Sequence, residues 1–190
     1  MRYAWLFALL ACRSPGSRYY TLVAPPGDAV KASGELQLDV LAVDVPPEVD
    51  RAELVVRQGA GEVTPVETRS WIAPLPLELR RALADDLTRL LGARDVAGLS
   101  PGEGVPTFRI KLAVRSFESE LGKRAVIDTV WSVRQTGDAT PALTCSSRAE
   151  HAAAGDYDGL VEAHQQALGK IAAAIAAGVR SLQAARPACP

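Results

Sequence analysis

Histidine, cysteine and methionine are scarce in this chain of 190 residues, which contains two, three and one of them. So few imidazole and thiol groups make a structural zinc or iron–sulfur site unexpected, because such sites need clustered ligands. Lys and Arg number 21 against 22 Asp and Glu, and no basic run occurs. Nucleic acid is therefore not an expected partner, since phosphate binding needs a basic face.

The motifs of common enzymes are also missing. The sequence has no G-x-S-x-G nucleophile elbow and no G-x-x-x-x-G-K-[ST] phosphate loop. His151 and His164 have no metal-ligand pattern around them, and we expect both to be exposed to solvent. Residues 156–159 start like a calcium loop but lack its later ligands, so helix capping is the expected role. The sequence thus predicts no enzyme, no metal and no cofactor, with a hydrolase of unrecognised site as the catalytic alternative.

The first dozen residues have the features of an export signal. Arg2 precedes an uncharged, mostly apolar run of nine residues, 3–11. Nine helical residues span about 13 Å, too short for a hydrocarbon core of about 30 Å, so the run fits a signal peptide. Its end, LLAC at 9–12, resembles a bacterial lipobox. In this interpretation residues 1–11 are removed and Cys12 is lipidated; the alternative is an ordinary core cysteine in a buried element.

Lipidation of Cys12 would hold the chain at a membrane without a spanning helix, because two or more acyl chains anchor firmly. Arg13 occupies the position where Asp usually implies inner-membrane retention in Gram-negative lipoproteins. The sequence therefore favours the periplasmic face of the outer membrane. Residues 12–18 are predicted to be a polar tether and 19–186 a single domain, since a chain of 190 residues has the length of one domain. The content of 48% apolar and 23% charged residues is close to the average of globular proteins.

Hydrophobic periodicity within the domain alternates between strand and helix patterns. From Leu77 onward an amphipathic helix ending before Gly92 is predicted, because leucines recur at spacings of three and four at 79, 83, 87 and 90/91. A second helix of about 25 residues is predicted after a cap at Asp156 or Asp158, and it ends before Pro187. Strands are predicted at 19–23, 35–45, 54–56, 63–69, 108–115, 126–133 and 142–149, with a loop at 24–33 and turns at 59–61 and 122–123.

These elements predict an α+β fold in which a mostly antiparallel sheet has two helices packed on one face. The last three strands are joined by short loops, so we expect an antiparallel meander. Trp131 is expected on the covered face of the sheet.

Two cysteines remain once Cys12 is assigned to lipid. Cys145 and Cys189 form an even pair in an oxidising compartment, where a disulfide is plausible chemistry. The alternative is one buried thiol and one free thiol in the tail. The sequence leaves both alternatives open.

The order of several motifs resembles one known family. These motifs are YYTL at 19–22 soon after the lipobox, VPPEVDR at 45–51 leading into a strand, and WIAPL at 71–75 heading a leucine-spaced helix. A later hairpin around Phe117 and an Ala-rich terminal helix complete the set. Together they resemble the ABC-type transport auxiliary lipoproteins, the PqiC- and YmbA-like proteins. Pro47 departs from the family pattern, which has an acidic or aromatic residue there.

The resemblance implies a non-catalytic periplasmic component of an intermembrane lipid transport system. Its expected partners are a membrane reached through the lipid anchor, an MCE-domain protein, and an ABC permease with its ATPase, and self-assembly into a homo-oligomer is compatible with such partners. The runner-up function is an envelope-assembly or peptidoglycan-associated lipoprotein. Candidate partner-docking loops carry Pro46, Pro47, Arg51, Trp71 and Pro74; alternatively, these residues only end strands and helices, and Trp71 seals the core.

Overall fold

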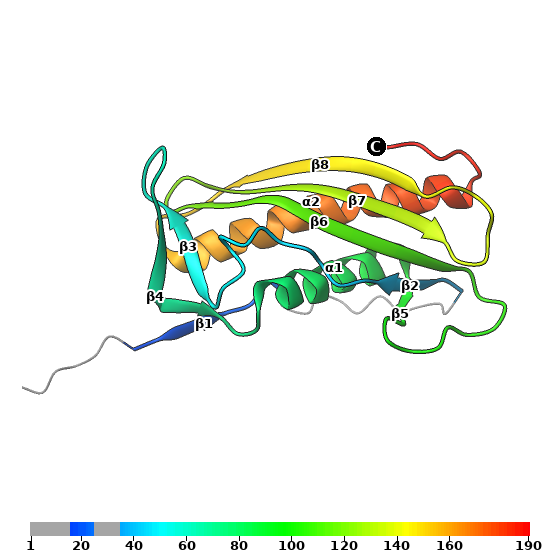
Figure 1. The fold of residues 1–190 in the computed structure, drawn as a ribbon, viewed down its shortest axis with the longest axis horizontal. Helices are drawn as coiled ribbons and strands as arrows, with labels where there is room; N and C mark the ends of the chain where they lie inside the picture. The colour runs from blue at the N-terminus through cyan, green and yellow to red at the C-terminus, as the bar shows by residue number, and fades with distance from the viewer. Residues whose placement is uncertain (1–15, 25–34) are drawn as a thin grey trace, which may run out of the picture.

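The computed structural model describes residues 16–24 and 35–190. The predicted signal peptide 1–11, the lipidation candidate Cys12 and most of the predicted loop 24–33 lie outside these residues. Figure 1 shows the elements in order: β1 (Arg18–Tyr20), β2 (Gln37–Val40), β3 (Glu53–Arg57), β4 (Val63–Trp71), α1 (Leu75–Leu91), β5 (Arg94–Asp95), β6 (Thr107–Glu120), β7 (Arg124–Gln135), β8 (Leu143–Ala152) and α2 (Tyr157–Gln183).

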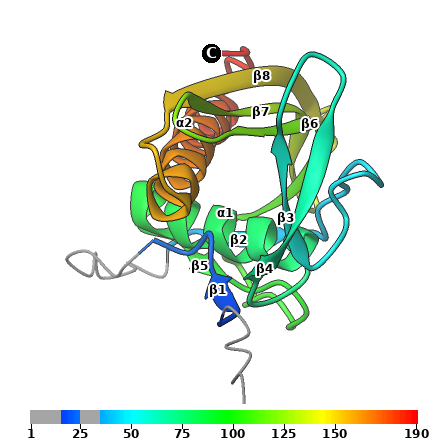
Figure 2. The same cartoon turned by 90° about the vertical axis from the view of Figure 1, so that its left-hand side faces the viewer.

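The larger sheet has five strands in the order β5-β2-β6-β7-β8, and both helices cover the same face of it (Figure 2). Strands β6, β7 and β8 form the predicted antiparallel meander. Strand β2, in contrast, runs parallel to both β5 and β6. The α+β class is confirmed, and the sheet is mixed rather than purely antiparallel, because hydrophobic alternation reports the buried face of a strand but not the direction of its neighbours.

A second sheet, which the sequence does not predict, lies at one end of the molecule (Figure 1). Its strand order is β1-β4-β3. The hairpin of β3 and β4 is the one predicted from the glycine-rich turn, which Gln58 N closes by donating to Glu62 O. Strand β1 joins β4 in parallel, with Tyr20 opposite Trp71. A parallel partner comes from a distant part of the chain, so no local turn signal announces it.

Strand β2 is shorter than the predicted strand 35–45. Leu41 N donates to Ile110 O and Asp44 N donates to Leu112 O, so three residues on one side span two on the other. Pairing is therefore interrupted after Val40 and returns only as an isolated bridge between Asp44 and Ala113.

Strand β6 keeps one face buried over its 14 residues because a bulge shifts which positions point inward. Phe108, Ile110, Leu112 and Val114 face the core, and the register then shifts between Val114 and Ser116. One extra residue in the strand reverses the parity of the inward positions. The positions that follow, Phe117 and Ser119, are buried as a result.

Helix α1 begins where the Pro74 carbonyl accepts from Leu77 N and Glu78 N. It ends at Gly92, whose φ of 62° places it in the left-handed region that glycine tolerates best. Its leucine face is buried, which confirms the amphipathic prediction.

Helix α2 is 27 residues long, and Asp156 caps it by accepting from Gly159 N at 2.8 Å. Its buried face alternates large Leu, Ile and Val side chains with Ala and with Gly178, and the small residues allow close approach to β7. A Cβ on Gly178 would stand 2.8 Å from Cη2 of Trp131, and this tryptophan is buried on the covered face as predicted. The absence of a side chain at Gly178 thus makes room for the indole ring.

Candidate functional site

Three of the five predicted docking residues border one cleft. Arg51, Trp71 and Pro74 line a cavity of about 360 Å³ together with Asp50, Ala52, Ile72 and Ala73. Trp71 N donates to Ala52 O at 2.8 Å, so the two segments 50–52 and 71–74 are held side by side. We call these two segments together with β1 the β1 end.

The side chain of Trp71 belongs to the core rather than to the surface. It is 5% exposed and meets the Phe117 ring edge-on, with centroids 6.1 Å apart. Its neighbour Ile72 is 67% exposed instead. Trp71 therefore supports the segments around the cleft, while Ile72 is the apolar side chain that this segment presents to solvent.

Pro46 and Pro47 are not among the residues that line this cleft. Val49 N donates to Pro46 O, which makes a tight turn, and the Val49 side chain is buried beneath it. Pro47 is exposed. The structure thus places these prolines on an exposed loop that precedes β3, and that loop reaches the cleft through Arg51.

The segment after β1 is fastened to both helices. The Glu78 carboxylate is buried and accepts from Thr21 Oγ1 at 2.7 Å and from Leu22 N at 2.9 Å. Gln165 Nε2, on α2, donates to Thr21 O at 3.1 Å. Burial, followed by a hydrogen bond to Asp158, raises the pKa of Tyr20. The first described residues are therefore a fixed part of the domain.

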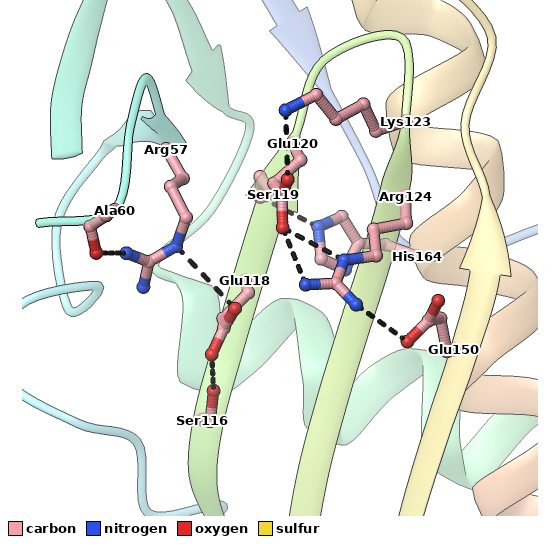
Figure 3. Close-up of polar contacts among 10 residues, drawn as sticks. All are labelled: Arg57, Ala60, Ser116, Glu118, Ser119, Glu120, Lys123, Arg124, Glu150 and His164. Carbon is pink, nitrogen blue, oxygen red and sulfur yellow. Dashed lines mark hydrogen bonds and ion pairs between the residues drawn. The ribbon is translucent and has the colours of Figure 1, made fainter. Parts of the chain in front are cut away.

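A charged network joins the two hairpins near the turn between β6 and β7 (Figure 3). Arg124 donates to Glu120 at 2.9 Å and to Glu150 at 3.2 Å, and Arg57 pairs with Glu118 at 3.6 Å. The hydrogen bond from Arg124 lowers the pKa of Glu120. With Lys123 added, cations and carboxylates balance, so the network ties β3 to β6 and β7 and leaves no excess charge for a ligand.

Behind this network lies a buried serine–histidine pair. Ser119 Oγ and His164 Nε2 share a hydrogen bond of 2.8 Å, and the His164 ring stacks on Phe117 with centroids 4.0 Å apart. His164 is 1% exposed, so the expectation of a solvent-exposed histidine is wrong: the residue occupies an inward position of α2. Its Nδ1 has no hydrogen-bond partner among the described residues.

The pair resembles a nucleophile and its base in distance but not in chemistry. Ser119 lines a cavity of about 160 Å³ between β3 and β6. Burial lowers the pKa of His164 from 6.5 to about 3. An imidazole with so low a pKa is a poor acceptor for the serine proton near neutral pH. In addition, no described group forms a hydrogen bond with its Nδ1 to orient the ring. The geometry therefore suits a packing role.

Cys145 and Cys189 are joined by a disulfide in the structure. The bond links the edge strand β8 to the tail that follows α2, and the two cysteines are 44 positions apart in sequence. Ser181 Oγ adds a contact to the tail by accepting from Ala188 N at 3.3 Å. The tail is thereby held against the end of the sheet.

Among residues 16–24 and 35–190, no group of three or more His, Cys, Asp or Glu side chains is arranged so that it could hold a metal ion. None of the helices in that part of the chain is both long and apolar enough to cross a bilayer.

Sequence reasoning misses the burial of Glu78 and the exposure of Tyr19 and Ile72. Glu78 reads as a polar position of an amphipathic helix, yet its side chain is buried under the segment that follows β1. The sequence gives no burial prediction for Tyr19 and Ile72, and the structure leaves each of them 67% exposed. One signal for Glu78 is its place in the first turn of α1, where a carboxylate is favoured by the helix dipole.

Comparison with known proteins identifies the family. The model of the family described as the ABC-type transport auxiliary lipoprotein component matches residues 20–176. No curated protein matches the chain. A crystal structure of an uncharacterized protein has a similar fold, with a TM-score of 0.68 and 21% identity over 87% of this chain and 99% of that one.

A crystal structure from Xanthomonas campestris is similar as well, with a TM-score of 0.62 and 16% identity over 88% of this chain and 98% of that one. Identities this low show a shared fold alone. The family match covers α1, every strand from β2 to β8, and most of α2. The chain therefore belongs to the family of ABC-type transport auxiliary lipoprotein components.

Proposed function

We propose that the protein is a non-catalytic lipoprotein, anchored through Cys12 to the periplasmic face of the outer membrane, that serves an ABC-type system moving lipid between membranes. The family match over residues 20–176 carries this proposal. The lipobox-like LLAC at 9–12 and Arg13 support the anchor and its membrane. The transported cargo and the MCE-domain partner follow from the family resemblance of the sequence.

A role without catalysis is supported by the chemistry of the interior. The pair of Ser119 and His164 is the arrangement closest to a catalytic one, and the lowered pKa of His164 makes it a weak base. The protein would work by position: the anchor holds it at the membrane, and one surface contacts the transporter.

We place the transporter contact on the loop that carries Pro46, Pro47 and Arg51. Pro47 and Arg51 are exposed, and the loop rests on a fixed base because Trp71 N donates to Ala52 O and the Trp71 ring is packed against Phe117. Pro74 completes that base, since its carbonyl starts α1. Trp71 and Pro74 are positioning residues in this proposal.

Two experiments test the proposal separately. Metabolic labelling with a palmitate analogue should label the full chain and not its Cys12→Ser variant; a variant that still labels refutes the anchor. Co-purification with the MCE-domain protein of the same genome should capture the partner at moderate salt. Clean separation of the two proteins would refute the partnership.

A matched pair of variants tests the contact surface. Arg51→Glu should weaken capture of the MCE-domain protein, because it reverses a charge on the proposed loop. Arg134→Glu makes the same charge change at an exposed position of β7, near the other end of the meander, and should leave capture unchanged. Equal capture by both variants would remove this loop from the contact.

A further inference from the structure

Two of the most exposed large apolar side chains lie side by side at the β1 end, Tyr19 on β1 and Ile72 directly after the last residue of β4. Tyr19 and Ile72 are each 67% exposed. Tyr19 pairs with Ser70, and Ile72 N donates to Tyr20 O at 2.8 Å. The hydrogen bond from Ile72 continues the pairing with β1 by one residue beyond the end of β4. Side chains alternate along a paired strand, so Ile72 lies on the same side as Tyr19 and Ser70 while Trp71 points to the other side. The burial of Trp71 agrees with this alternation. We call the outer side the Tyr19–Ile72 face.

This face lies close to the point where the chain arrives from Cys12. Arg18, the first residue of β1, is six positions after Cys12 in the sequence. A fully extended chain spans at most about 3.5 Å per residue, so Cys12 lies within about 20 Å of Arg18. Because the bonds to Glu78 and Gln165 fix the segment after β1, the face cannot swing away from the anchor independently of the domain.

We propose that the Tyr19–Ile72 face rests on the phospholipid surface that holds the acylated Cys12. The inference depends on the lipidation in the proposed function and adds an orientation to it. A tyrosine suits the boundary between headgroups and acyl chains because its ring is apolar and its hydroxyl polar, and an exposed isoleucine gains by leaving water. A protein bound to this face instead would have to fit between the domain and a bilayer about 20 Å away at most.

In the proposed orientation, the end of the molecule farthest from β1 points away from the membrane into the periplasm. The connection between β5 and β6 lies at the end of the molecule away from β1 (Figure 1). It carries Leu99, which is 73% exposed. Leu99 is therefore a matched control: an equally exposed apolar side chain that should not meet lipid.

Quenching by brominated lipid tests the contact in the full lipidated chain. Tyr19→Trp, Ile72→Trp and Leu99→Trp variants are reconstituted in phosphatidylethanolamine and phosphatidylglycerol vesicles, with and without bromine near the top of the acyl chains. Trp71 and Trp131 give a background that the unchanged chain measures. We expect bromine to reduce the added fluorescence by at least half at positions 19 and 72 and to leave position 99 unaffected.

The outcomes separate this inference from the proposed function. Lipidated protein that floats with the vesicles but is quenched equally at all three positions, or at none, overturns the orientation and leaves the anchor intact. Protein that neither carries acyl mass nor floats refutes both. If Ile72→Asp abolishes capture of the MCE-domain protein while position 19 stays unquenched, the face binds protein and the inference is wrong. Circular dichroism checks that each variant is folded.

Discussion

Acid should destabilise the domain through His164. Its pKa is about 3 in the folded protein because of burial, against 6.5 for the ordinary side chain. Between these values the unfolded chain binds a proton that the folded chain excludes, so the free energy of unfolding falls as the pH drops below 6.5 and the loss levels off below about 3. Each pH unit is worth about 1.4 kcal/mol, which makes the loss about 2 kcal/mol at pH 5.

Urea unfolding at pH 7.5 and pH 5, followed by tryptophan fluorescence, measures this loss. The His164→Gln variant keeps a polar group for Ser119 but cannot take up the proton. Its stability at pH 7.5 should be lower than that of the unchanged protein, because the ring stacked on Phe117 is lost. Between pH 7.5 and pH 5, however, the free energy of unfolding of the variant should fall by about 2 kcal/mol less than that of the unchanged protein.

Carboxylates titrate in both the unchanged protein and His164→Gln, so their contribution to the pH dependence is the same in the two proteins and drops out of the difference. His151→Gln is the matched control: it removes the other histidine, and the pH dependence should persist because His164 still titrates. Equal pH dependence in the unchanged protein and in His164→Gln would refute the assignment of a buried, neutral imidazole.

Two further predictions concern packing and the tail. Gly178→Ala should destabilise the domain by about 1–3 kcal/mol, because the new Cβ would stand 2.8 Å from Trp131. Gly169→Ala on the same helix should instead stabilise the domain by up to about 1 kcal/mol, because its Cβ would make only an ordinary van der Waals contact. Thermal melts of both variants check the opposite signs, and a stabilised Gly178→Ala would contradict the packing. Cys189→Ser should lower the free energy of unfolding by about 4 kcal/mol on the chain-entropy model, with 44 residues of separation from Cys145. Unfolding in reducing buffer should reproduce the loss, and no difference between the oxidised and reduced proteins would argue against the bond.

Local patterns were sufficient to predict the helices and the hairpins. Leucine spacing and Gly92 defined α1 to within two residues, and Asp156 marked the start of α2. The meander followed from alternation and from short loops such as the one at Gly122. These features depend on neighbours within a few residues, which is the range that sequence patterns report.

Features that depend on distant partners were beyond the same reasoning. The parallel pairing of β1 with β4 joins residues about 50 apart, and the two-residue strand β5 has too few positions to show alternation. His164 and Glu78 are polar residues whose burial is decided by Ser119 and Thr21 from other parts of the chain. Such partners become visible only once the tertiary arrangement is known.

The parallel pairing of β1 with β4 also determines how the domain would bear a mechanical load. A pull on residue 16 from the N-terminal side acts along β1, so the hydrogen bonds to β4 are loaded in shear and share the force. The Glu78 carboxylate and the Gln165 amide take up the same pull just beyond the strand. The attachment therefore resists detachment in two stages, because the hydrogen bonds of β1 to β4 bear the pull first and the contacts to the two helices stand behind them.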